Sequence, residues 1–182
     1  ISSGAKQSCY NACLALLDPG DEVIIPAPYW VSYPDMVGLA DATPVIVAST
    51  AERGFRIGAH ELAVAITPRT RLLILNSPCN PTGAAYSRAD WLALGSVLRA
   101  HPEIVILSDE IYGRILYEGE HESIAARPGM DDLAIVLDGF SKTYAMTGWR
   151  IGYAVMDAKL AVTIARLQTN ATSCTAAFTP RR

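Results

Sequence analysis

One lysine and one arginine near the end of the chain have a spacing that could support chemistry. Lys142 and Arg150 lie eight residues apart, and three glycines stand around them: Gly139, Gly148 and Gly152. A lysine amine can form a Schiff base with a carbonyl compound, and a nearby arginine can bind an anionic group of the same compound. Such a pair by itself is more often a surface lysine and a salt-bridged arginine. Further motifs in the sequence are therefore needed to distinguish a Schiff-base site from this ordinary arrangement.

Polar side chains follow three predicted strands at the point where each strand ends. Residues 76–80 follow one strand, residues 109–112 follow the next, and residues 141–142 follow a third. Open α/β sheets bind ligands along the edge where their parallel strands end. The three loops are therefore expected to converge on one site, with Lys142 facing Asp109.

The elements that position these loops are predicted from apolar spacing and turn residues. Short apolar strands are expected at residues 22–27, 43–48, 71–76, 104–107, 133–137 and 151–156, and helices at residues 8–17, 31–39, 60–66, 87–100 and 158–168. Strands that are apolar on both faces and alternate with helices indicate a largely parallel sheet that is covered on both sides. With no internal repeat or linker, the sequence predicts one α/β domain, in which Ser87 is a helix N-cap.

Composition argues against several functional classes. Of the 182 residues, 51% are hydrophobic and 18% are charged, and the formal net charge is -3. Lysine and arginine form no basic stripe, and no apolar run approaches the roughly 20 residues that span a bilayer, so neither nucleic acid nor membrane is an expected partner. The four cysteines form no CxxC pair and no histidine stands near them at metal-ligand spacing, which predicts no metal site and a reduced, cytoplasmic protein.

Both ends of the sequence look internal to a longer chain. Ile1 leads directly into Gly4 and Ala5, a pattern typical of a strand that turns into a helix. At the other end, residues 179–182 follow a helical stretch without a closing element. We therefore expect residues 1–182 to be part of a larger protein.

Residues 139–152 (GFSKTYAMTGWRIG) resemble, at all fourteen positions, the signature of class I aminotransferases around the lysine that binds pyridoxal 5'-phosphate. Four further segments resemble motifs of the same family in the same order: GAKQ at 4–7, PYW at 28–30, SPCNPTG at 77–83 and SDEIY at 108–112. The resemblance implies the fold type I large domain, an α/β fold with three αβα layers around a mostly parallel, mixed sheet. It also implies that residues 1–182 are a partial pyridoxal-phosphate-binding domain, without its N-terminal segment and C-terminal small domain. Cis peptide bonds are implied before Pro28 and Pro81.

The resemblance assigns three catalytic residues. Lys142 would hold pyridoxal 5'-phosphate as a Schiff base and then move a proton as a general base. Asp109 would pair with the pyridine nitrogen and keep it protonated, which makes the ring an electron sink. Tyr112 would donate a hydrogen bond to the phenolic oxygen of the cofactor.

Further cofactor and substrate contacts are implied by the same motifs. Ile111 and Trp30 would pack on the two faces of the ring, and Asn80 would bond both the phenolic oxygen and a substrate carboxylate. The phosphate site would use the amides of Ala5 and Lys6 at a helix N-terminus together with Arg150, with Ser141 as a further cofactor contact. Trp30, Asn80 and Lys6 are the expected substrate contacts.

At two positions this sequence differs from many members of the family. Gly139 stands where many relatives have a serine that bonds the phosphate, so one contact would be lost. Lys6 stands where other relatives carry a smaller hydroxyl residue and resembles the bacterial aspartate and prephenate aminotransferase subgroup. There this side chain reaches the distal carboxylate of the substrate, although a lysine at a helix start could equally point to solvent.

The resemblance implies transamination between an amino acid, aspartate or another dicarboxylic or aromatic one, and a 2-oxo acid, in a homodimer. Three alternatives stay open: another enzyme on the same scaffold (a C–S lyase or a cyclopropane-forming synthase), the cofactor-sensing domain of a transcription regulator, and an inactive isolated fragment. Glu110 is expected to be structural. The three histidines, His60, His101 and His121, are expected to be surface or packing residues.

Overall fold

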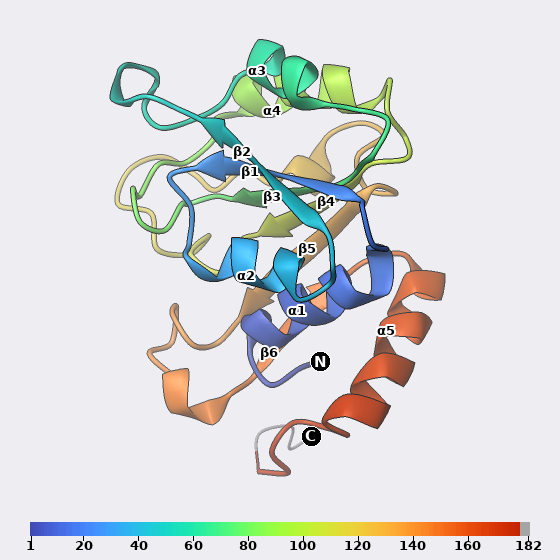
Figure 1. Ribbon diagram of the computed structural model, residues 1–182. Coiled ribbons are helices and arrows are strands. Elements are labelled where there is room, and N and C mark those ends of the chain that lie inside the picture. Colours follow the sequence, from blue (N-terminus) through green and yellow to red (C-terminus); the bar gives the residue numbers. More distant parts are fainter. Residues whose placement is uncertain (179–182) are drawn as a thin grey trace.

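A six-stranded β-sheet forms the centre of the computed structural model, which describes residues 1–178 (Figure 1). The strands lie in the order β2-β1-β3-β4-β5-β6. Their bounds are β1 Glu22–Ala27, β2 Thr43–Ala48, β3 Thr70–Asn76, β4 Val105–Asp109, β5 Ala134–Gly139 and β6 Gly152–Val155. Strands β1 to β5 are parallel to one another, whereas β6 pairs with β5 in the antiparallel direction. The sheet is therefore mixed and mostly parallel, as predicted.

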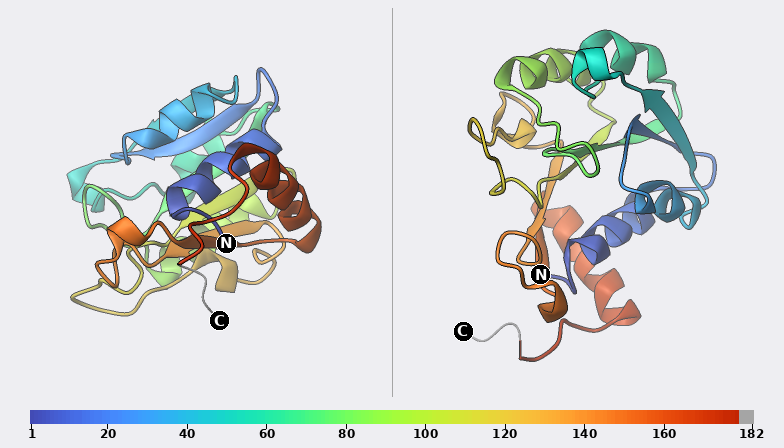
Figure 2. Two further views of the ribbon diagram at one scale, coloured as in Figure 1. Left: turned by 90° about the horizontal axis from the view of Figure 1, so that it is seen from below. Right: turned by 90° about the vertical axis from the view of Figure 1, so that its left-hand side faces the viewer.

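Helices cover both faces of the sheet, with α1, α2 and α5 on one face and α3 and α4 on the other (Figures 1 and 2). Their bounds are α1 Ala5–Leu16, α2 Ser32–Gly38, α3 Ala59–Ala65, α4 Arg88–Leu98 and α5 Ala158–Ala171. The predicted three-layer αβα architecture is thus confirmed.

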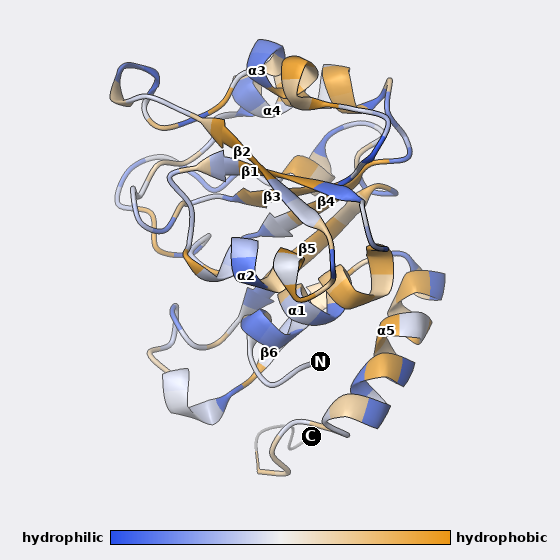
Figure 3. Ribbon diagram, in the orientation of Figure 1, coloured by the Kyte–Doolittle hydropathy of each residue, from blue (hydrophilic) through white to orange (hydrophobic). Residues whose placement is uncertain are grey.

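Two apolar cores fill the space between the layers. Successive residues of a strand point to opposite faces, so Ile25 and Ile74 belong to the core under α1 and α2, and Ile24 and Leu73 belong to the core under α4. All four side chains are essentially fully buried. Figure 3 shows the hydrophobic colour along β5 and alternating colours on α5, which buries one side only. Burial on both faces explains why these strands are continuously apolar.

Helix boundaries differ from the prediction where polar residues interrupt the apolar periodicity. The apolar spacing begins only at residue 8, because the first turn of α1 contains the polar Lys6 and Gln7, whereas α1 itself begins at Ala5, where the motif at residues 4–7 implies a helix N-terminus. α5 continues to Ala171. The predicted cap at Ser87 is confirmed, since its hydroxyl accepts from the amide of Asp90 at 3.3 Å. Three 3₁₀ helices are too short to show a period: Ala51–Arg53, Ile124–Ala126 and Thr147–Trp149.

The N-terminal segment is fixed to the edge of the sheet. Ser2 forms an isolated antiparallel bridge with Gly152, with N–O distances of 2.8 and 3.0 Å. A Cβ atom on Gly152 would collide with the backbone of Gly4 and Ala5. This close approach requires glycine, and it places the N-terminus of α1 beside the end of β5, because Gly152 also pairs with Gly139.

Within residues 1–178, three X-Pro peptide bonds are cis. Ala27-Pro28 and Asn80-Pro81 agree with the prediction, and Ser77-Pro78 is a third that the motifs do not imply.

The described residues bear on several other expectations. All four cysteines are free, and Cys9 and Cys13 are buried on one side of α1. No helix within residues 1–178 has the length and apolarity needed to cross a membrane. The same residues contain no group of three or more histidine, cysteine or acidic side chains that could hold a metal ion. The expected open end at residues 179–182 lies outside the described residues.

Candidate active site

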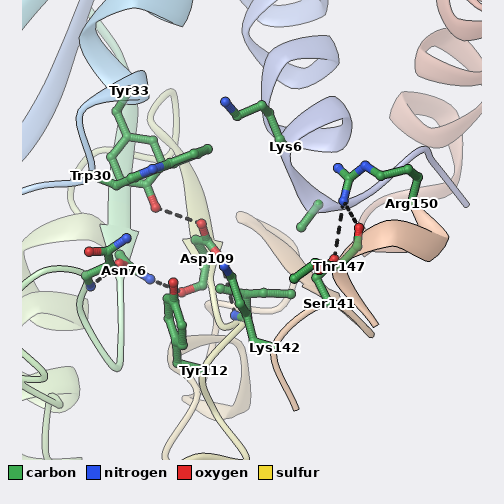
Figure 4. A pocket seen from close by; sticks show the side chains of 13 residues that line it. Lys6, Trp30, Tyr33, Asn76, Asp109, Tyr112, Ser141, Lys142, Thr147 and Arg150 are labelled. Carbon is green, nitrogen blue, oxygen red and sulfur yellow. Dashed lines mark hydrogen bonds between the residues drawn. The ribbon is translucent and has the colours of Figure 1, made fainter. Parts of the chain in front are cut away.

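A cavity of about 260 Å³ opens at the edge of the sheet where β3, β4 and β5 end (Figure 4). The ten cofactor, catalytic and substrate residues predicted from the sequence all line it: Ala5, Lys6, Trp30, Asn80, Asp109, Ile111, Tyr112, Ser141, Lys142 and Arg150. Tyr33, Asn76 and Thr147 complete the lining. The structure thus brings every predicted site residue to one place, while their roles in binding and catalysis remain predictions.

The register between parallel strands explains this convergence. Asn76 at the end of β3 is paired with Asp109 at the end of β4, and Asp109 is paired with Leu137 of β5. β5 ends at Gly139, just before Lys142. Three strands that end at the same level therefore deliver their following loops to a common edge.

Asp109 supplies a buried carboxylate at the closed end of the cavity; the residue is 6% exposed. The Tyr33 hydroxyl donates to Oδ2 at 2.7 Å, and the Ile111 amide donates to Oδ1 at 3.2 Å. Burial raises the pKa of Asp109, and these two hydrogen bonds offset only part of the rise. No cation of residues 1–178 forms an ion pair with it. A carboxylate in this setting is suited to a cationic or proton-bearing partner.

The opposite end of the cavity is suited to an anion. The N-cap of α1 is Gly4, which has no side chain to bond the first-turn amides, so those of Ala5 and Lys6 are free to bind a ligand. Arg150 closes this end: its Nη1 lies 2.8 Å from the Thr147 carbonyl oxygen and 3.5 Å from Ser141 Oγ. The cavity therefore has an acidic end and a cationic end.

Arg150 also spans to the start of α1, because its Nη2 donates to the Ser3 carbonyl oxygen at 3.2 Å. Gly4 lies beneath the guanidinium with φ 91° and ψ 156°, a backbone conformation that is essentially restricted to glycine. A Cβ atom at this position would collide with the guanidinium group of Arg150.

Gly4→Ala is therefore expected to lower the free energy of unfolding by about 1–3 kcal/mol and to weaken the binding of inorganic phosphate. Gly20→Ala is the matched control, because Gly20 has φ 92° but no heavy atom within 4 Å of the added Cβ. Urea unfolding and phosphate titration would measure both effects. Equal phosphate affinity in Gly4→Ala and Gly20→Ala would contradict the role of the Gly4–Arg150 contact.

Two amines lie beside aromatic rings in the cavity. Lys6 Nζ is 4.7 Å from the centroid of the Trp30 ring, and Lys142 Nζ is 5.9 Å from the centroid of the Tyr112 ring. Both lysines are exposed, whereas Asp109 is buried. The two amines thus belong to the solvent-exposed part of the cavity lining.

Asn76 fixes the loop that follows β3. Its Nδ2 donates to the carbonyl oxygen of Asp109 at 2.9 Å, and its Oδ1 accepts from the amide of Asn80 at 2.7 Å. One side-chain amide therefore sets the position of Asn80 relative to the strand end that carries Asp109.

The glycine at position 139 has a packing reason. A Cβ atom there would lie 3.0 Å from the Ile151 carbonyl oxygen, 3.1 Å from Gly152 Cα and 3.3 Å from Ile111 Cδ1. A side chain at this position would require β6 or Ile111 to move. The packing around position 139 therefore favours glycine, independently of the phosphate contact that a serine would provide.

The sequence analysis assigned no role to three of the lining residues and misjudged one histidine. Asn76 was expected at this edge of the sheet as part of residues 76–80, but without a role, whereas Tyr33, three residues after Trp30, was not expected there. Thr147 lies within the motif at residues 139–152, but the motif does not indicate a role for its side chain. His121 is not merely a surface or packing residue, because its Nε2 lies 2.7 Å from Oε2 of the buried Glu110.

Comparison with known proteins identifies the family. The family model "Aminotransferase class I and II" matches residues 1–180. The aspartate aminotransferase of Rhizobium meliloti (strain 1021) is 50% identical over 176 residues, which cover 96% of this chain and 43% of that protein. The aspartate/prephenate aminotransferase of Cereibacter sphaeroides is 50% identical over 175 residues, covering 95% and 44%. The chain belongs to the aminotransferase class I and II family.

Solved structures agree with this assignment. The crystal structure of the Rhizobium meliloti aspartate aminotransferase has a TM-score of 0.95 and 49% identity, covering 98% of this chain and 45% of that chain. The Thermus thermophilus aspartate aminotransferase with maleate has a TM-score of 0.91 and 42% identity, covering 96% and 45%. The chain spans less than half the length of these relatives. The fold is that of pyridoxal-phosphate-dependent transferases, and the relatives' names agree with the predicted resemblance to the aspartate and prephenate subgroup.

Proposed function

We propose that the complete protein is a pyridoxal-phosphate-dependent aminotransferase. It would move an amino group between an amino acid, aspartate or another dicarboxylic or aromatic one, and a 2-oxo acid. The observation that carries this proposal is the convergence of the Lys142 amine, the buried Asp109 carboxylate and the anion site at Arg150 on one cavity.

The donor set of the cavity fits pyridoxal 5'-phosphate. The first-turn amides of α1, the Ser141 hydroxyl and Arg150 offer hydrogen-bond donors and a positive charge at one end, which suits a phosphate. Asp109 offers a buried carboxylate at the other end, without a cationic partner among residues 1–178, which suits a protonated pyridine nitrogen. Gly4 keeps clear the space beneath Arg150 that a Cβ atom would fill.

The remaining lining residues would contact the ring. Trp30 and Ile111 provide apolar surface for its two faces, and Asn80 and Tyr112 provide donors for its phenolic oxygen. When bound, pyridoxal 5'-phosphate supplies a conjugated ring that accepts the electron pair of a substrate Cα–H bond. Trp30, Asn80 and Tyr112 would hold that bond aligned with the ring.

Lys142 would do two things at different times. Its amine would hold the cofactor before the substrate arrives, and once the substrate has displaced it the amine would take the Cα proton and deliver it to the C4′ carbon of the cofactor, as amino transfer requires. Asp109 would keep its negative charge in a buried place, where an electrostatic contact is stronger than in water. Tyr33 would assist by donating a hydrogen bond from its hydroxyl to Asp109 Oδ2.

The substrate preference would follow from Lys6. Its amine lies over the Trp30 ring in the solvent-exposed part of the cavity lining, where it could meet a second carboxylate on the substrate. The Thermus relative was solved with maleate, a four-carbon dicarboxylate, which supports a dicarboxylic substrate for this protein.

Lys6→Met is expected to lower kcat/KM for aspartate by about 10- to 100-fold, because a charge-assisted contact is worth roughly 1.5–3 kcal/mol. Methionine keeps the unbranched apolar stem, so phenylalanine should be turned over as before. Steady-state assays of the complete protein with each amino donor would measure this. Unchanged turnover of aspartate would remove the proposed role of Lys6.

The proposed reaction is tested by supplying the complete protein with pyridoxal 5'-phosphate, aspartate and 2-oxoglutarate. Formation of oxaloacetate and glutamate in equal amounts is expected. Release of ammonia without formation of glutamate would instead indicate a lyase on the same scaffold, and no reaction with any amino donor would contradict the proposal.

The chain's place in the complete protein is also a proposal. We infer that residues 1–182 form part of the large cofactor-binding domain, with an N-terminal segment and a small domain outside them. The coverage of less than half of the relatives' length supports this. We further propose a homodimer in the cytoplasm, where the free thiols of Cys9 and Cys13 would stay reduced.

A further inference from the structure

A cluster of polar side chains lies behind the cavity, around Glu110. This residue follows Asp109 at the end of β4 and is 8% exposed. Its Oε1 accepts from the hydroxyls of Ser108 at 2.9 Å and Ser123 at 2.6 Å. Its Oε2 lies 2.7 Å from His121 Nε2. An ionised carboxylate only accepts hydrogen bonds, so this ring nitrogen carries the proton.

The cluster encloses the turn that carries Tyr112. The amide of Gly113 donates to the carbonyl oxygen of Glu110 at 2.7 Å. A Cβ atom on Gly113 would lie 3.0 Å from Cδ2 of His121, so the imidazole packs directly on the turn. Ile111 and Tyr112, which stand between Glu110 and Gly113, both line the cavity. A movement of the imidazole would therefore reach two cavity residues.

The segment that contains His121 has its own support from α4. The indole nitrogen of Trp91 donates to the carbonyl oxygen of Glu122 at 2.8 Å. The carboxylate of Glu122 forms an ion pair with Arg127 at 2.8 Å, and the Arg127 side chain is only 10% exposed. His121 is therefore held on the turn by a fixed neighbour.

Acidic groups surround the imidazole: Glu110 at the end of β4, Asp138 on β5 and the adjacent Glu122. The hydrogen bond that His121 donates to Glu110 raises the pKa of His121, while partial burial opposes the rise. The contribution of this pair to stability is therefore complete below the unfolded value near pH 6.5. It is lost as pH rises through the raised folded value.

We propose that Glu110 and His121 form a positioning pair, which holds the Ile111–Tyr112 turn in the geometry that cofactor binding and amino transfer require. This proposal rests on the proposed function, because Tyr112 is the expected donor to the cofactor. Neither member of the pair lines the cavity, so both act through the turn. A buried pair that only stabilised the fold would affect the unfolding midpoint and leave turnover unchanged.

The first test compares His121→Ala and His121→Gln in the complete protein. His121→Ala is expected to lower kcat about 10- to 100-fold, with KM little changed, because a small displacement of a cavity residue acts mainly on the transition state. His121→Gln, whose amide can still donate to Glu110, should recover most of this loss.

The matched control is His101→Gln. His101 lies 3.2 Å from Glu103 in a similar pair, but it precedes β4 and is remote from the strand end that carries Glu110. Wild-type kcat is expected for this variant. Wild-type kcat in His121→Ala as well would overturn the proposal.

The second test uses the cofactor-free protein. The nuclear magnetic resonance signal of isotope-labelled Tyr112 is expected to shift with the titration of His121 in the wild type and to lose this step in His121→Gln. A Tyr112 signal with the same pH dependence in both proteins would overturn the proposal, even if His121→Ala failed to fold. Failure of the proposed function would appear differently, as wild-type protein that does not bind pyridoxal 5'-phosphate.

Discussion

Asp109→Asn is expected to lower kcat/KM of the complete protein by on the order of 10³-fold while raising the stability of its cofactor-free form. The variant removes the charge that would stabilise a protonated ring nitrogen, and an amide cannot replace it. The same charge is unfavourable when no partner is bound, because Asp109 is buried without a cation among the described residues. The charge of Asp109 is therefore expected to be required for activity and to lower the stability of the cofactor-free protein.

The pH dependence of stability shows whether the buried charge of Asp109 stabilises or destabilises the cofactor-free protein. Burial raises the folded pKa of Asp109 above its ordinary value of 3.8. The folded protein therefore binds the proton more tightly than the unfolded chain, and stability falls as pH rises from 3.8 through the raised value. Urea unfolding of cofactor-free protein at acidic and neutral pH would show this fall in the wild type and its reduction in Asp109→Asn. A variant that is less stable than wild type at neutral pH would contradict the argument.

Lys142→Ala is expected to lower kcat by about 10⁴-fold or more, because the variant lacks the general base as well as the amine that would hold the cofactor. Its stability should stay within about 0.5 kcal/mol of wild type, since Lys142 is exposed and forms no ion pair within residues 1–178. Loss of activity would then reflect chemistry and not unfolding.

Lys159→Ala is the matched control for this variant. Lys159 is exposed in the first turn of α5 and does not line the cavity. The two variants should have the same unfolding curve, and only Lys142→Ala should lose activity. An active Lys142→Ala enzyme would contradict the assignment of the catalytic amine.

The sheet and the convergence of its loops could be predicted because they follow from local patterns. Apolar runs such as residues 72–75 are buried on both faces, and parallel strands end at the same edge. The motifs around Asn80, Asp109 and Lys142 then placed all predicted site residues in one cavity. Each of these inferences needs only residues that are close in sequence.

The remaining features depend on contacts that no local pattern encodes. The hydrogen bond from Tyr33 to Asp109 joins residues that are 76 positions apart. The pairing of His121 with Glu110 requires a loop to fold back onto the end of β4. The packing that excludes a side chain at Gly139 comes from β6 and Ile111, which approach it only in the folded chain. Sequence therefore predicted which residues line the cavity better than which residues hold them in place.

The central claim is that Lys142 binds the cofactor covalently, and borohydride reduction tests it most directly. Residues 1–182 contain three lysines, Lys6, Lys142 and Lys159, of which the first two line the same cavity. Reduction of the complete protein with bound pyridoxal 5'-phosphate, followed by peptide mass mapping, is expected to find the pyridoxyl group on Lys142. A pyridoxyl group on Lys6 or Lys159, with Lys142 unmodified, would contradict the account.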